Sequence, residues 1–96
     1  MPVKESFGVL AYLLDYYFKP SAVRDLRRLP KNAQKRIIRK LNFFTKSDEP
    51  LGFAETIKDK ALGGYRFRIG DYRAIFDLVG DKIVVLAVGH RKDIYN

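Results

Sequence analysis

Two glycine–aspartate pairs, Gly70-Asp71 and Gly80-Asp81, most constrain the fold, because each separates two runs of β-prone residues. Glycine at the first position of a two-residue loop favours the type II′ turn, which matches the right-handed twist of a β-hairpin. The sequence therefore predicts strands at 65–69, 72–79 and 82–89, joined as a three-stranded antiparallel meander.

The short turns also predict which side chains share a face of this sheet, because a two-residue loop fixes the register of a hairpin. Counting from the turns places Arg68 opposite Arg73, and Arg73 opposite Val88 on the last strand. Alternation of side chains then predicts one apolar face that packs on the core. Its members are Tyr65, Phe67, Ile69, Tyr72, Ala74, Phe76, Leu78, Ile83, Val85 and Ala87.

The opposite face is predicted to carry Arg66, Arg68 and Arg73. Like charges directly opposite each other cost roughly a few tenths of a kcal/mol, so this cluster indicates a bound anion. Phosphate is the best candidate, because arginine matches it in bidentate geometry. The alternative is that the three stems splay apart into water, beside Asp71 and Asp77.

The segment after the last strand adds His90, Arg91 and Tyr95, and we expect His90 to emerge on the same side as the arginine cluster. A lone histidine is more often structural than catalytic, but its place near four arginines makes it a candidate site residue. Val84, Leu86 and Val88 are also predicted on this side. The tail, the N-terminal residues or a partner chain would have to cover them.

Upstream of the meander, the pattern predicts a strand over 12–18 and two helices. Ser21 is the expected cap of the first helix, which ends near Leu29, and Asn32 is the expected cap of the second. Apolar residues recur in the second helix at spacings of three and four, at Ala33, Ile37, Leu41 and Phe44. Residues 47–52 are expected to form a loop, and 53–64 fit no single element. The fold class predicted is α+β, with a helical hairpin on one face of the sheet.

The net charge of +8 is concentrated between residues 19 and 46, where ten basic residues accompany a single acid, Asp25. Such a block suits a polyanion, and it favours nucleic acid over an acidic protein or a membrane surface. The alternative is an ordinary solvated helical surface. With 96 residues the chain is expected to be one domain, residues 1–96.

The chemistry that the residues exclude narrows the choice further. The chain has no cysteine and one histidine, and its acids lie at turns, so no cofactor or metal site is expected. Absence of disulfides suits a cytoplasmic location, and no apolar run is long enough to cross a membrane. An enzyme of this kind would act mainly through positive charge, which suits RNA, because the 2′-hydroxyl of RNA can attack its own phosphate.

Three stretches resemble the RelE family of bacterial and archaeal toxins. They are Tyr17-Phe18-Lys19-Pro20-Ser21-Ala22-Val23-Arg24-Asp25-Leu26, then Tyr65-Arg66-Phe67-Arg68-Ile69-Gly70-Asp71-Tyr72-Arg73, and finally Val88-Gly89-His90-Arg91-Lys92-Asp93-Ile94-Tyr95. The resemblance covers about residues 15–95. Residues 1–11 have no counterpart in the shortest members and are either an extra segment or the result of an early start codon.

The resemblance implies a toxin that cleaves mRNA codons in the ribosomal A site and leaves a 2′,3′-cyclic phosphate. A RelB-like antitoxin would hold it inactive, and its other partners would be the ribosome and mRNA. The functional set that the resemblance implies is Arg66, Arg68, Arg73, Arg91 and Tyr95, and the place of His90 near the arginines adds it to the candidate catalytic residues. Arg73 and Arg91 would contact the scissile phosphate, and Tyr95 would stack on or orient a base. The helical residues implied to hold ribosomal RNA are Arg24, Arg27, Arg28, Lys31, Lys35 and Arg39.

One departure from the family concerns proton transfer. The best-known RelE has lysines on the second strand, whereas this chain has Arg66 and Arg68, which stay protonated and cannot act as a base. Either His90 or Tyr95 would have to transfer the proton, or this step would be only weakly catalysed. Two other functions stay open: a ParE-like toxin that inhibits DNA gyrase without nuclease activity, and a basic RNA-binding module without catalysis.

Overall fold

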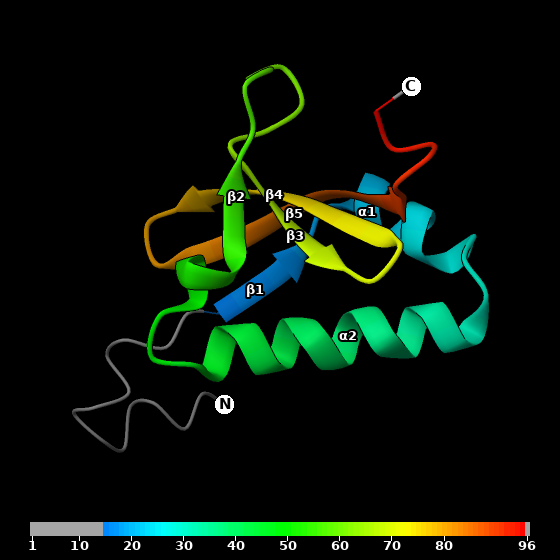
Figure 1. Ribbon diagram of the computed structural model, residues 1–96, viewed down its shortest axis with the longest axis horizontal. Coiled ribbons are helices and arrows are strands. Elements are labelled where there is room, and N and C mark those ends of the chain that lie inside the picture. The colour runs from blue at the N-terminus through cyan, green and yellow to red at the C-terminus, as the bar shows by residue number, and fades with distance from the viewer. Residues whose placement is uncertain (1–14, 96) are drawn as a thin grey trace.

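The structure, a computed structural model, describes residues 15–95 and is an α+β domain with a five-stranded sheet (Figure 1). The elements follow in the order β1 (Asp15–Phe18), α1 (Pro20–Arg27), α2 (Lys31–Lys46), the short 3-10 helix η3 (Pro50–Phe53), β2 (Ala54–Thr56), β3 (Tyr65–Ile69), β4 (Tyr72–Val79) and β5 (Lys82–His90). The predicted α+β class is confirmed, and so is the meander, which forms β3, β4 and β5. Of the strand expected over 12–18, residues 12–14 lie outside the described residues.

The strands lie side by side in the order β1-β5-β4-β3-β2, and β1 runs parallel to β5 while the other pairs are antiparallel. The turn between β3 and β4 has Gly70 at a φ of +61°, and no residue other than glycine has a positive φ within residues 15–95. This is the pattern of the predicted type II′ turn. The edge strand β2 falls in the segment 53–64 that fits no single element from its sequence.

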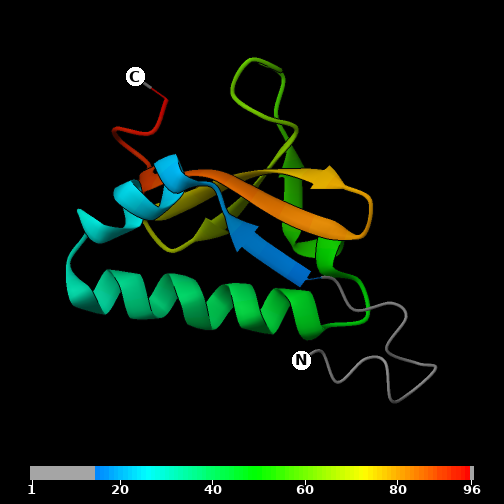
Figure 2. The same cartoon turned by 180° about the vertical axis from the view of Figure 1, so that it is seen from behind.

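The main core lies between the sheet and the two helices. In Figures 1 and 2, α2 runs along one face of the sheet, and α1 lies beside β5. The apolar residues predicted on this face from β3 and β4 are there, together with one face of α2. The buried cluster comprises Ala22, Ile37, Leu41, Phe44, Phe67, Ile69, Ala74, Phe76, Ile83, Val85 and Val88.

The predicted register of β5 is wrong beyond Val85, because the strand contains a β-bulge. Phe76 pairs with Val85 but Ile75 pairs with Ala87, so Leu86 is an extra residue on β5. Such a bulge shifts every later residue to the other face of the sheet. Val88 therefore belongs to the main core, Ala87 does not, and Arg73 lies opposite Gly89.

The same bulge overturns the placement of His90 on the arginine face. His90 pairs with Tyr72, whose ring packs against the main core, and the two rings meet edge to face at 5.5 Å. Because directly paired residues share a face, His90 lies on the helix side of the sheet. Counting residues from the turns could not reveal this, since no local signal marks the bulge.

The helix starts also differ from the prediction, since neither Ser21 nor Asn32 is an N-cap. The caps are Lys19 and Pro30, without a capping side chain. The Ser21 hydroxyl instead donates to the carbonyl oxygen of Leu86 at 3.2 Å, and the side chain of Asn32 accepts from the neighbouring Ala33 N–H. Pro20 begins α1, in keeping with the preference of proline for the first turn.

The second face of the sheet carries a smaller apolar group, of which Ile57, Ile75 and Val84 are buried. The loop between β2 and β3 covers it: a Cβ atom on Gly63 would lie 2.7 Å from Ile75 Cγ2 and 3.0 Å from Leu86 Cδ1. The C-terminal turn contributes Ile94, which lies against Gly89. The C-terminal tail, which the sequence predicted as a possible cover for this face, therefore helps to cover it. The β2–β3 loop also covers it, and the sequence did not predict this.

Across residues 15–95, no helix has the length and apolar character needed to span a membrane.

Candidate functional site

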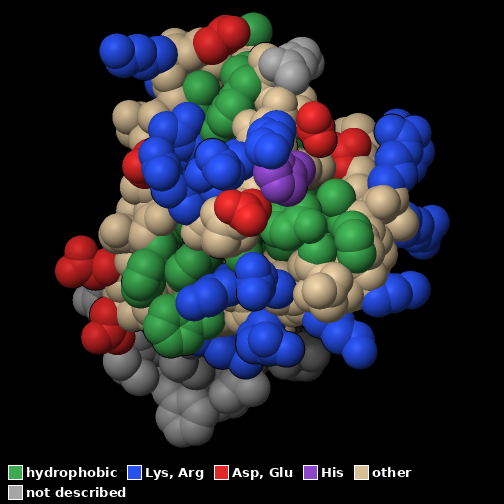
Figure 3. Space-filling model, turned by 45° about the vertical axis from the view of Figure 1, so that its right-hand side comes forward, with side chains coloured by type: hydrophobic (Ala, Val, Ile, Leu, Met, Phe, Trp, Pro, Cys, Tyr) green, Lys and Arg blue, Asp and Glu red, His purple; other side chains and the backbone are tan. Residues whose placement is uncertain are grey.

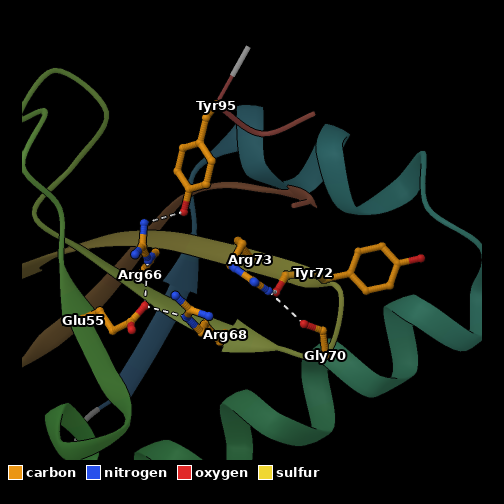
Figure 4. Close-up of polar contacts among 7 residues, drawn as sticks. All are labelled: Glu55, Arg66, Arg68, Gly70, Tyr72, Arg73 and Tyr95. Atoms are coloured by element: carbon orange, nitrogen blue, oxygen red, sulfur yellow. Dashed lines mark hydrogen bonds and ion pairs between the residues drawn. The ribbon is translucent and has the colours of Figure 1, made fainter. Parts of the chain in front are cut away.

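The arginines of β3 converge on a carboxylate that the sequence did not reveal (Figure 4). The Nε atoms of Arg66 and Arg68 both donate to Oε1 of Glu55, each at 2.8 Å. Glu55 lies on the edge strand β2 directly opposite Arg66, with Arg68 on the diagonal. The like-charged arginines on this face are therefore partly neutralised within the chain itself.

These contacts change the ionisation of the groups involved. The hydrogen bonds from Arg68 and then Arg66 lower the pKa of Glu55 to about 2. The bond to Glu55, and then the bond to Tyr95, raise the pKa of Arg66 above its usual value. Glu55 is consequently an anion, and Arg66 a cation, at every physiological pH.

Arg73 is placed opposite Arg68, as predicted, but the residue is largely buried, with 9% of its surface exposed. Its Nη1 atom donates to the carbonyl oxygens of Gly70 and Tyr72, both at 2.8 Å. Both bonds lead back into the β3–β4 turn, so Arg73 also supports the hairpin. A ligand could reach only the remaining part of its guanidinium group.

Arg91, the first residue after β5, contacts the same β3–β4 turn through Asp71. Its backbone N–H donates to the Asp71 carbonyl oxygen at 2.7 Å, and its Nε donates to Asp71 Oδ1 at 3.2 Å. Its side chain is about half exposed, at 53%. His90, on the helix side, accepts at Nδ1 a hydrogen bond from the Lys92 N–H at 3.1 Å. A neutral His90 that accepts at Nδ1 carries its proton on Nε2.

Tyr95 joins the C-terminal turn to the arginine cluster. Its hydroxyl accepts from Arg66 Nη1 at 3.0 Å, and the Arg66 guanidinium lies 5.7 Å from the centre of its ring. Both residues border a groove of about 340 Å³ between this turn and the β2–β3 loop. The other lining residues are Thr56, Ile57, Lys58, Asp59 and Leu62. A groove with an apolar floor and a tyrosine in its wall can accept a planar ring such as a nucleobase.

The basic residues of the helices all face outward. The six expected to contact RNA are exposed: Arg24, Arg27, Arg28, Lys31, Lys35 and Arg39. Figure 3 shows basic side chains gathered on this side of the molecule, around the single histidine and across the surface below it. Arg36 approaches the β3–β4 turn as well, since its Nη1 lies 2.9 Å from where a Gly70 Cβ would be.

The structure thus brings Arg66, Arg68, Arg73 and Tyr95 together on one face, with Arg91 at the adjoining turn and His90 on the other side of the sheet. Sequence reasoning missed Glu55. The only signal was an acidic residue in a short β-prone segment, and β2 has three residues, too few for a visible alternation. Among residues 15–95, no group of three potential ligand side chains could hold a metal ion.

Comparison with known proteins connects this geometry to a family. Residues 16–95 match the family model described as the ParE toxin of the type II toxin–antitoxin system parDE. No curated protein matches the chain significantly.

Three solved structures are similar to the chain. The RelB–RelE antitoxin–toxin complex of Methanococcus jannaschii contains a chain with 31% identity and a TM-score of 0.63, covering 81% of this chain and 93% of that one. The RelBE2 toxin–antitoxin complex of Mycobacterium tuberculosis contains a chain with 26% identity and a TM-score of 0.67, and the match covers 82% of this chain and 99% of that one. The archaeal RelE–RelB complex of Pyrococcus horikoshii contains a chain with 23% identity and a TM-score of 0.64, and the match covers 83% of this chain and 97% of that one. At this identity the likeness supports the fold alone. With a family model matched over most of its length, the chain belongs to the RelE/ParE superfamily of type II toxin–antitoxin toxins and is of the RelE type.

Proposed function

We propose that this toxin is a ribosome-dependent endoribonuclease that cuts mRNA in the A site. The observation that carries the proposal is the Tyr95–Arg66 contact, which joins an aromatic ring to a cluster of three arginines beside a groove. Arginines can bind a phosphate, and a tyrosine next to them can stack on the adjoining base. The exposed basic residues of α1 and α2 would hold ribosomal RNA.

The reaction would be a transesterification within the RNA. The 2′-oxygen attacks the adjacent phosphorus, its proton passes to a base, and the bond to the 5′-oxygen of the next nucleotide breaks as that oxygen takes up a proton. The products are a 2′,3′-cyclic phosphate and a 5′-hydroxyl. Arg73 and Arg91 would stabilise the negative charge that builds on the phosphate oxygens, and Arg66 and Arg68 would orient the backbone.

The acceptor of the 2′-hydroxyl proton is the weakest part of this site. Arg66 and Arg68 remain protonated, and a Glu55 with a pKa of about 2 is a poor base. In the observed arrangement the lone pair of His90 Nδ1 accepts from the Lys92 N–H and Nε2 carries the proton. His90, on the helix side of the sheet, could therefore give a proton to the leaving 5′-oxygen, but it could take up the 2′-hydroxyl proton only after its bond to Lys92 breaks. We therefore propose slow cleavage, in which positioning and charge provide most of the acceleration.

The partner of this toxin would be a RelB-like antitoxin. The similar chains of known structure come from toxin–antitoxin complexes, which supports this partner. An acidic segment would complement the exposed basic surface of α1 and α2. Co-purification of a tagged toxin with the product of the adjacent gene tests the assignment, and recovery of the toxin alone would contradict it.

A ParE-like gyrase inhibitor is the second candidate, because the matching family model is that of a ParE toxin. The pairing of Arg66 and Arg68 with Glu55 within the chain also favours gyrase inhibition. A surface that only binds another protein does not need arginines that are free to bind a phosphate.

Primer extension in a translating extract separates the two functions. Arg68→Ala is the main variant, because Arg68 is 58% exposed and its removal should spare the fold. Arg73→Ala is the second, although it also removes two bonds of the hairpin. Lys46→Ala, an exposed cation at the end of α2, is the control for charge alone.

We expect cuts within codons that require ribosomes and Arg68 and that persist in Lys46→Ala. Intact messages together with inhibited supercoiling by purified gyrase would replace the nuclease with the ParE-like function. Binding of RNA without any cut product, and without gyrase inhibition, would leave an RNA-binding module.

A further inference from the structure

A carboxylate occupies the place where an RNA phosphate would bind the second-strand arginines. One oxygen atom, Oε1 of Glu55, accepts from the Nε atoms of both Arg66 and Arg68 at 2.8 Å. A phosphate oxygen in the same place could also accept hydrogen bonds from both guanidinium groups. Glu55 and a phosphate group would then compete for the same two donors.

The pair of arginines is accessible to a ligand from solvent. The side chain of Arg68 is 58% exposed, that of Glu55 is 44% exposed, and that of Arg66 is 26% exposed. The groove beside Tyr95 begins at Arg66, so a nucleotide bound there would bring its phosphate to this pair. Ion pairs this exposed are weak, and they can exchange one anion for another.

The backbone of β2 allows Glu55 to move aside without unfolding the edge of the sheet. The strand is held by main-chain pairing of Ala54 with Phe67, Glu55 with Arg66 and Thr56 with Tyr65. These hydrogen bonds do not involve the Glu55 carboxylate. Rotation of one exposed side chain is therefore enough to open the two Nε donors.

We propose that Arg66 and Arg68 form a binding site for an RNA phosphate that the Glu55 carboxylate occupies in the free protein, so that RNA binds only by displacing it. The identity of the ligand rests on the function proposed above. Glu55 then weakens binding to RNA in general. Tight binding would need the additional phosphate contacts of the basic helices, which a large structured RNA such as the ribosome can supply and a short free strand cannot.

The proposal is tested by measuring how tightly purified full-length protein binds a fluorescein-labelled single-stranded RNA of about 12 nucleotides, by anisotropy without ribosomes. Glu55→Gln removes the competing charge and keeps the shape of the side chain. Glu49→Gln is the matched control, because it changes the net charge equally. Glu49 is exposed, and its side chain makes no hydrogen bond or ion pair within residues 15–95.

We expect Glu55→Gln to bind the RNA about tenfold more tightly, the effect of removing a unit charge a few ångströms from a phosphate at a surface site. Glu49→Gln should bind like the wild type. The gain should disappear in the double variant Glu55→Gln with Arg68→Ala. Thermal unfolding of each variant establishes that the compared proteins are folded.

Equal affinity of Glu55→Gln and Glu49→Gln would overturn the proposal, because the carboxylate would not compete with RNA. Weaker binding by Glu55→Gln would overturn it too, since Glu55 would then organise the arginines for the ligand. The outcome is independent of cleavage. Tighter binding by Glu55→Gln, with no cut product from the wild type, would reject the nuclease function but support the proposal that RNA displaces the Glu55 carboxylate.

Discussion

The Asp25 carboxylate on α1 accepts a hydrogen bond from the backbone N–H of Val88 on β5, at 3.1 Å. The strand β1 pairs with β5 only as far as Val85, so the later residues of β5 lack a neighbouring strand on that side. Helix α1 takes its place: Ser21 donates to Leu86, and Asp25, one turn later, accepts from Val88. The acid within the basic block thus satisfies one backbone N–H beside the β-bulge.

Asp25→Ala should destabilise the protein by about 1–3 kcal/mol, because the partly buried Val88 N–H would have no acceptor. Asp25→Asn, which keeps an acceptor oxygen, should cost less stability. The measurement is the free energy of unfolding in urea, with Asp48→Ala as a control for removal of an exposed acid. Equal stability of the Asp25→Ala and Asp48→Ala variants would show that the bond contributes nothing.

Gly63→Ala should also destabilise the fold, by about 1–3 kcal/mol, since a new methyl group would press on a packed neighbour. Its Cβ would lie 2.7 Å from Ile75 Cγ2, and Gly63 has a φ of +149°. Gly52→Ala is the control, because a Cβ there would lie 3.7 Å from its nearest neighbour, at ordinary van der Waals distance. Thermal unfolding of the two variants should show a lower midpoint for Gly63→Ala alone.

Glu55 should make stability depend on pH in the acid range. Its pKa falls from 4.5 to about 2 on folding, so the unfolded chain binds a proton more readily than the folded one. The stabilisation by Glu55 is complete above about pH 4.5 and disappears as the pH falls towards 2. Urea unfolding at several pH values should therefore show wild type more stable than Glu55→Gln at neutral pH, with the difference narrowing below pH 4.5. A difference that is the same at every pH would refute the ionic origin of this effect.

Tyr95→Ala should reduce cleavage about 5- to 100-fold, the range expected when one base is deprived of an aromatic stacking partner. Tyr95→Phe keeps the ring and removes only the hydroxyl that accepts from Arg66. If stacking is the role of Tyr95, this variant should retain most of the activity. Single-turnover cleavage on programmed ribosomes distinguishes the cases, and a Phe variant as slow as the Ala variant would assign the role to the hydroxyl group.

The basic helices should determine how binding to structured RNA responds to salt. Removing one cation that neutralises a phosphate makes the slope of log K against log salt concentration shallower by about 0.9 on a duplex. We expect this change for Arg27→Ala and for Lys35→Ala, both exposed, measured with a ribosomal RNA fragment. Lys46→Ala, at the far end of α2, should leave the slope unchanged. Identical slopes for all three variants and the wild type would mean that these helices do not bind the RNA.

Local signals accounted for most of the fold. The glycines of two short turns and the alternation around them predicted β3, β4, most of β5 and the face that carries Arg66, Arg68 and Arg73. The apolar spacing in α2 predicted the face that packs on this sheet. These features depend on neighbours a few residues apart, so the sequence alone reveals them.

The long-range contacts lay beyond such signals. The bulge at Leu86 moved Val88 and His90 to the other face of the sheet, and its backbone groups are satisfied by Ser21 and Asp25, more than sixty residues away in the chain. Glu55 contacts Arg66 and Arg68 only because the three-residue strand β2 pairs with β3 at the edge of the sheet. Periodicity reports the faces of a single element, whereas a bulge, a short edge strand and the charges that they bring together depend on packing between distant segments.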